Sequence, residues 1–393
     1  MNLLEKSGSA ARGRLRAGSA VLSGVCALAL LSGASAARAG ATIKISDESS
    51  ISVGLGMRGS FSSNEHGASD GSRSEDFNLD SVRLYVNGQL TKSIGATFNT
   101  ERDSDGDIKL LDGYMRYEPM DEFNIWAGRL LPPSDRSNLD GPYYLSTWNY
   151  PGLVSQYPAK FAGRDDGVTI WGKLFEKKLT YAIGAFNGHN RFSGASNAGH
   201  EPLIAGRVAF NFLDVEDNPG YYTSSTYYGT ADIFTVGASV MYQKDGVGSA
   251  LVRGNYFGWN VDALFEKKIM DGGAITLEGS YYKYDTDDVV DVTPGFNGAG
   301  GTDNVGGLVQ GDGFLVSAAF LFPQEIGIGK LQPVVRYQSF DLDLVPLKFK
   351  QWDAGLNYII KGHNARLSAT YSNLDLGAGV DNDVFTLGAQ LQF

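Results

Sequence analysis

The chain has 393 residues, with 33 lysines and arginines against 44 aspartates and glutamates, a net charge of −11 at pH 7. That sign argues against nucleic acid as a partner, because the phosphates would be repelled. The single cysteine, Cys26, lies near the N-terminus, so beyond it we expect no disulfide, no cysteine-held metal and no covalently attached haem.

The first residues have the layout of an export signal. A basic stretch precedes an apolar run over 17–31, and a small-x-small cleavage site ends at Ala39, with Ala36 as the competing cut. The apolar run is too short to span a membrane as a helix. We therefore predict a signal peptide over 1–39 and an exported protein over 40–393, which carries 28 basic and 43 acidic residues.

The exported part has no apolar stretch of spanning-helix length, yet it is rich in glycine, tyrosine and phenylalanine. Its apolar residues alternate with polar ones instead. In the clearest segment, 79–91, Val82, Leu84 and Val86 fall on one face and polar residues on the other. Period-two alternation with two different faces is typical of a strand that has lipid on one side and water on the other.

The same alternation predicts about sixteen strands, an all-β fold in the form of a transmembrane antiparallel β-barrel. Bacterial barrels of this kind have an even number of strands, so both termini lie at one end. The predicted strands are 50–62, 79–91, 94–98, 111–118, 123–129, 168–174, 180–187, 205–212, 233–243, 251–265, 274–284, 313–322, 331–340, 349–361, 365–372 and 383–393.

The connections sort by parity into short periplasmic turns and long extracellular loops. The words Phe-Glu-Lys-Lys occur twice, at 175–178 and 265–268, and predict two turns at the same end of the barrel. One connection breaks the pattern, since residues 214–230 are long where a short turn is expected. Either a hairpin is miscounted there or the segment is an ordered periplasmic flap.

The stretch from Arg129 to Arg164 has neither a strand period nor a sustained helical period, and it is rich in proline and aromatic residues. Loops this long within a compact fold are usually functional. We interpret residues 130–163 as a third loop that folds inward and narrows the lumen. Its aromatic residues either stack on permeating solutes or pack the loop against the wall, and packing is favoured. They are Tyr143, Tyr144, Trp148, Tyr150 and Tyr157.

Charged residues on the polar strand faces are expected to line the lumen. Strand parity directs Arg83, Arg116, Arg207, Arg336 and Arg366 inward, and the candidate ion path adds Arg129, Arg136, Lys160 and Arg164. Parity also directs six acids inward: Glu101, Asp112, Glu118, Asp262, Glu278 and Asp353. Each arginine either pairs with a neighbouring carboxylate or remains open to anions. A mixed constriction predicts weak selectivity and a transverse field.

The last strand ends in Phe393, which resembles the signal that outer-membrane barrels present to their assembly machinery. Together with this residue, the blocks 82–88, 126–133 and 162–168 resemble the phosphate-selective porin superfamily of Gram-negative outer membranes. The resemblance implies a homotrimer of sixteen-stranded barrels in outer-membrane lipid. It also implies a pore narrowed by the third loop in each barrel, and passive transport of anions such as phosphate along basic side chains.

Enzymatic and metal-dependent functions find little support. Four histidines lack metal-ligand spacing, and there is no Gly-x-Ser-x-Gly or phosphate-loop motif. We predict no enzyme activity, cofactor or metal. The expected function is a passive channel for small hydrophilic solutes and ions, leaning towards anions. The alternative is a structural or ligand-binding surface barrel with an occluded lumen.

Overall fold

The structure is a computed structural model that describes residues 40–102, 106–156, 158–188, 201–248, 251–269, 271–289, 310–377, 379 and 381–393. The predicted signal peptide and Tyr157 lie outside the described residues. Within the ranges described, no helix is both long enough and apolar enough to cross a membrane.

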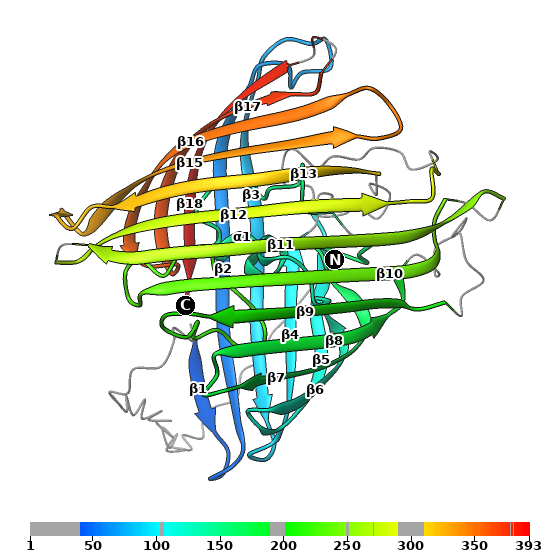
Figure 1. Cartoon of the computed structure of the whole chain (residues 1–393). Coiled ribbons are helices and arrows are strands. Elements are labelled where there is room, and N and C mark those ends of the chain that lie inside the picture. The colour runs from blue at the N-terminus through cyan, green and yellow to red at the C-terminus, as the bar shows by residue number, and fades with distance from the viewer. Residues whose placement is uncertain are drawn as a thin grey trace, which may run out of the picture. The chain divides into compact units, whose positions relative to one another are not determined.

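Sixteen antiparallel strands form a closed ring, in which each strand pairs with the next and the last strand pairs with the first (Figure 1). The prediction of an antiparallel barrel of about sixteen strands is therefore confirmed. The wall strands are β2 (Ser50–Asn64), β3 (Ser74–Gln89), β4 (Ile94–Arg102), β5 (Ile108–Met120), β6 (Phe123–Leu130), β7 (Asp165–Leu174), β8 (Leu179–Phe186), β9 (Leu203–Asn211), β10 (Ile233–Gly248), β11 (Arg253–Ile269), β12 (Gly273–Asp285), β13 (Gly311–Leu321), β15 (Gly329–Leu342), β16 (Lys348–Lys361), β17 (Ala365–Asp375) and β18 (Asp381–Gln392).

Two short strands stand outside this ring. β1 (Ala41–Lys44) pairs with the start of β2, and β14 (Glu325–Ile326) makes a tight hairpin with the start of β15. The ring itself closes where β18 pairs with β2, from Val384 opposite Asn64 to Gln392 opposite Gly56. Closure leaves no strand edge unpaired. An unpaired edge in contact with lipid would leave backbone N–H and C=O groups without hydrogen-bond partners, which is costly.

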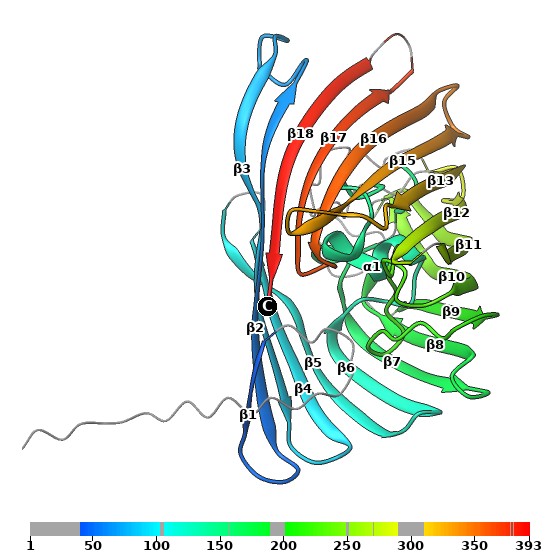
Figure 2. The same cartoon turned by 90° about the vertical axis from the view of Figure 1, so that its left-hand side faces the viewer.

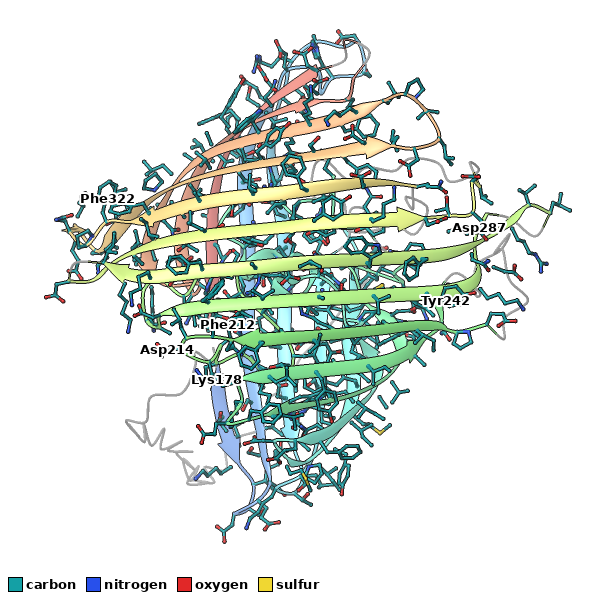
Figure 3. The ribbon with its side chains drawn as sticks, in the orientation of Figure 1. Lys178, Phe212, Asp214, Tyr242, Asp287 and Phe322 are labelled. Atoms are coloured by element: carbon teal, nitrogen blue, oxygen red, sulfur yellow. The ribbon has the colours of Figure 1, made fainter. Side chains whose placement is uncertain are left out.

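Each wall strand has one apolar face and one polar face. In β11, Phe257, Trp259 and Val261 point outward and are 36–44% exposed, whereas Asn260 and Asp262 point inward and are at most 3% exposed. Figure 3 shows side chains on both sides of the strands. The alternation read from the sequence thus corresponds to an oily exterior and a polar, charged interior.

Of the two turns predicted at Phe-Glu-Lys-Lys, the prediction for 175–178 is correct and that for 265–268 is wrong. Residues 175–178 do form a turn, in which Phe175, Glu176 and Lys177 have positive φ angles of 53–67°. Residues 265–268 instead belong to β11, whose pairing with β12 runs on to Ile269 opposite Gly273. β11 continues through these residues because they still pair with β12. The turn therefore falls a few residues later, at the same end of the barrel.

The irregular connection is not a miscounted hairpin, because β9 and β10 pair directly. We call residues 212–232 the flap. At its base the hairpin continues through Phe212 and Asp214, whose amides donate to the carbonyls of Phe234 and Asp232. In Figure 3, Phe212 and Asp214 lie with Lys178 at one end of the strands, whereas Tyr242 and Asp287 lie towards the other. Beyond this base the flap folds into the barrel, as described below.

Candidate channel constriction

The connection between β6 and β7 folds into the barrel, as predicted. We call residues 131–164 the constriction loop. It contains the helix α1 (Arg136–Tyr144), which lies within the ring of strands (Figure 2). Gly141, with a φ of 62°, and Pro142 interrupt the helix, which explains why the sequence shows no sustained helical period. The loop has apolar anchors of its own, since Leu139 and Leu153 are at most 2% exposed.

Wall side chains hold the middle of the loop, residues 143–149, through its carbonyl oxygens. Arg58 donates to Trp148 at 2.6 Å, and Arg336 donates to Asn149 at 2.8 Å. Three further donors reach neighbouring carbonyls. They are Gln390 to Tyr143 at 3.0 Å, Arg366 to Leu145 at 2.5 Å and Asn357 to Ser146 at 2.8 Å. The same short segment of backbone is therefore positioned by five wall strands, namely β2, β15, β16, β17 and β18.

The described loop aromatics all contact neighbouring protein groups. Tyr143 is fully buried, and its hydroxyl lies 3.0 Å from Ser81 Oγ. The guanidinium carbon of Arg58 lies over the ring of Trp148, 3.9 Å from the ring centre. The ring of Tyr144 packs at an angle against that of His363, with 4.8 Å between ring centres, and the hydroxyl of Tyr150 is 2.5 Å from Ser155 Oγ. These contacts support the packing interpretation of the loop aromatics.

Most of the predicted lumen arginines have a carboxylate partner. Arg83 lies 2.6 Å from Glu101, Arg207 lies 2.6 Å from Asp262, and both pairs are almost inaccessible to solvent. Two other wall pairs are Arg116 with Glu118 at 3.1 Å and Arg336 with Asp353 at 2.9 Å, and Arg164, at the end of the constriction loop, pairs with Asp112 of β5 at 3.1 Å. Pairing compensates these charges where they are buried, and it removes them as free sites for a passing ion.

Arg136, at the start of α1, joins the loop to two other parts of the barrel. Its guanidinium lies 2.6 Å from Glu216 of the flap and 3.7 Å from Asp262 of β11. Asp262 is also held by Arg207, whose two terminal nitrogens donate to it at 2.6 and 2.7 Å. Two guanidiniums and two carboxylates thus form one buried network at the constriction.

Two buried arginines have no carboxylate within ion-pair distance among the described residues. Arg366 was predicted from strand parity, but Arg58 was missed. Both lie opposite Gln390, Arg58 across the β2–β18 ladder and Arg366 across the β17–β18 ladder. They therefore form one row on the lumen face. The signal for Arg58 was present, because Val53, Leu55 and Met57 all point outward, and residues of the other parity then point inward.

Arg129 was predicted to line the lumen, and the structure contradicts this. It lies opposite Gly113, which shares the outward side of β5 with Met115, whereas the neighbouring Leu130 is fully buried. Its guanidinium is 2.7 Å from Asp166, which also pairs with Lys160. The three residues form a cluster at the loop-bearing end of β6 and β7, with side chains 19–33% exposed.

Asp135 and Asp140 of the constriction loop and Glu278 of β12 are buried without a cation at ion-pair distance among the described residues. Glu278 of β12 is buried, and Asp140 of α1 lies close enough to interact with its charge. Burial, followed by the charge of Glu278, raises the pKa of Asp140 well above its ordinary value. Asp135, which accepts hydrogen bonds from Ser155 and Tyr282, has its pKa raised to about 6, chiefly by burial. Neither oxygen of Asp140 has a hydrogen-bond partner in the described part of the chain.

No protein-family model matches the chain, and no curated protein matches its sequence. Solved structures do resemble it. The anion-selective porin from Comamonas acidovorans superposes with a TM-score of 0.58 at 13% identity, covering 88% of this chain and 100% of that one. The outer-membrane channel DcaP of Acinetobacter baumannii gives 0.54 at 15% identity, covering 90% and 100%. The trimer form of OmpT from Vibrio cholerae gives 0.53 at 13%, covering 88% and 100%. The chain therefore has the fold of the outer-membrane porins.

Proposed function

We propose that this protein is an outer-membrane porin, a passive channel for small hydrophilic solutes and ions. The observation that carries the proposal is the closed barrel with an apolar exterior, a charged interior and a loop folded across the lumen. Such a cylinder is stable in lipid because every strand is paired and the apolar face is outside. Export by residues 1–39 and assembly through the strand that ends in Phe393 complete the proposal.

The proposed selectivity is a lean towards anions, including phosphate. Arg58 and Arg366 keep buried donor nitrogens without hydrogen-bond partners among the described residues, namely Nε of both and Nη2 of Arg366. An arginine stays charged at every working pH, and its planar fork fits phosphate and carboxylate groups. Buried carboxyls can instead take up a proton, as the raised pKa of Asp140 favours. At neutral pH the groups of the constriction that keep their charge without an ion-pair partner are therefore mainly basic.

Homotrimer formation in Gram-negative outer-membrane lipid belongs to the same proposal. Its supports are the resemblance of the sequence blocks to the phosphate-selective porins and the trimer form described for the OmpT structure of Vibrio cholerae. Native-state mass measurement in detergent, before and after heating, would give the number of barrels per particle.

A second candidate function is a surface barrel with an occluded lumen. It is favoured by the depth of burial around the constriction loop, where Gln338 is 0%, Arg366 1% and Gln390 3% exposed. These side chains point inward, yet little solvent reaches them. Loop and flap together fill this level of the barrel.

Planar bilayer recordings separate the two candidates. We expect discrete conductance steps from the purified protein and, across a salt gradient, a reversal potential that favours anions. Absence of steps in bilayers that accept a control porin would contradict the channel and support the occluded barrel. Steps with a cation-favouring potential would keep the channel and remove the anion preference.

A further inference from the structure

The flap enters the barrel from the end opposite the constriction loop, and most of its tip is buried. Tyr221 and the four residues 223–226 are at most 7% exposed. A connection at this end needs only a few residues, as the other turns there show. Seventeen residues, 215–231, extend beyond the paired base of the flap, where the amide of Asp232 donates to a carboxylate oxygen of Asp214 at 2.9 Å. The additional length is therefore used inside the barrel.

The flap bonds to the constriction loop at the loop's start, at the start of α1 and at the end of α1. Tyr221 donates to the carbonyl of Leu131 at 2.6 Å. The hydroxyl of Thr223 donates to the carbonyl of Arg136 at 3.1 Å, and Arg136 donates in return to the carbonyl of Ser224 at 2.9 Å. At the other end of the helix, the amide of Ser146 donates to Ser225 Oγ at 2.6 Å.

A carboxylate of the wall holds the flap in place. Glu266 of β11 accepts hydrogen bonds from Thr226 Oγ1 at 2.8 Å and from the amides of Tyr227 and Gly229 at 2.9 and 2.7 Å. Glu266 is fully buried, and a charge in that position is stable only with donors such as these. On the other side, Trp126 lies 5.3 Å from Tyr221 and 5.5 Å from Tyr222 between ring centres.

We propose that the flap is a second constriction element, which positions the constriction loop from the opposite end and sets the conductance and size limit of the channel. Glu216 is its positioning residue, because it holds the guanidinium of Arg136 at 2.6 Å. Without Glu216, Arg136 would share Asp262 with Arg207 and would become available to anions. The inference rests on the proposed channel function.

The decisive experiment replaces residues 215–231 by Asn-Gly, a pair that suits a two-residue hairpin turn on the paired base. We expect single-channel conductance to rise about twofold or more, because conductance follows the open width of a pore. Larger neutral sugars should also enter liposomes that carry the variant. The control shortens the exposed connection 66–72 between β2 and β3, which should leave both readouts unchanged. A β-rich circular dichroism spectrum and heat-dependent gel mobility establish that each barrel is folded.

The outcomes separate the inference from the function on which it rests. Equal conductance of folded wild type and folded deletion would overturn the inference while leaving the channel intact. A silent wild type with a conducting deletion would support the flap as the closing element and overturn the open channel. Silence of both would overturn the channel, and the inference with it.

A point variant tests the positioning role without removing any backbone. Glu216→Gln should shift the reversal potential towards anions, because it releases the charge of Arg136 while keeping the shape of the side chain. Asp217→Asn is the matched control, since Asp217 is the exposed neighbour in the flap and its loss changes the same formal charge. A shift of the same size in both variants would contradict the positioning role of Glu216.

Discussion

Two sides of the constriction carry buried groups of opposite charge that have no ion-pair partner among the described residues. On β2 and β17, Arg58 and Arg366 face the constriction loop without carboxylate partners among the described residues. Around α1 and β12, Asp135, Asp140 and Glu278 are buried without cationic partners in the same part of the chain. The charges on the two sides therefore respond differently to a change of pH. A guanidinium cannot discharge by losing a proton, whereas a buried carboxyl can discharge by gaining one.

The largest expected effect follows from removing the basic side. In the double variant Arg58→Gln, Arg366→Gln we expect the reversal potential to lose its anion preference. Even about 1 kcal/mol of lost attraction corresponds to about a fivefold change in a ratio of populations. The measurement is the reversal potential across a potassium chloride gradient.

The same arginines hold the loop backbone, so the control must keep their charge. The double lysine variant retains two cations and should retain the anion preference, whereas Asn357→Ala removes only an uncharged donor to the loop. Loss of preference in the lysine or alanine variant would show that loop position, and not charge, sets selectivity.

A smaller effect is expected from pH on the acidic side. Because burial raises the pKa of Asp135 to about 6, lowering the pH from 7 to 5 protonates it, and the anion preference should increase. His363 contributes nothing in this window, since burial lowers its pKa to about 4 and it stays neutral. In Asp135→Asn the pH dependence between 7 and 5 should flatten. An unchanged slope in that variant would assign the titration to another group.

The ionisation of Asp135 also makes the stability of the folded protein depend on pH. The pKa of Asp135 is higher in the folded state than its ordinary value of 3.8, so the folded protein binds this proton more tightly than the unfolded chain does. Its contribution to stability is therefore fully present below pH 3.8 and is lost as the pH rises through about 6. Unfolding in urea at pH 5 and pH 7, with Asp135→Asn for comparison, isolates this contribution.

The smallest effect is expected at Arg129. Since the strand register turns it outward, Arg129→Gln should leave the reversal potential within experimental error of the wild type. Its salt bridge with Asp166 is partly exposed, and such pairs contribute about 0–1 kcal/mol to stability. A clear shift towards cations would place Arg129 on the ion path after all and would enlarge the basic side beyond β2 and β17.

The sequence by itself determined the architecture of the wall. Period-two alternation depends only on neighbouring residues, so it predicted all sixteen strands, the inward direction of Arg83, Arg207 and Arg336, and a loop that does not belong to the wall. Strand ends were less accurate, as the extension of β11 through 265–268 shows, because a strand ends where its partner does. Arg129 shares the parity of Phe123 and Ile125, which points it outward, so alternation by itself did not support its place on the ion path.

Only the tertiary structure decided which charges are cancelled and how the lumen is filled. Arg207 and Asp262 lie 55 residues apart in sequence and Arg136 and Glu216 lie 80 apart, and alternation carries no information at such separations. The same holds for the flap, whose hydroxyl-rich tip looks like any polar connection until Glu266 and the backbone of the constriction loop supply its hydrogen-bond partners. Burying polar backbone is costly unless every such group is matched, and that matching is a property of the assembled barrel.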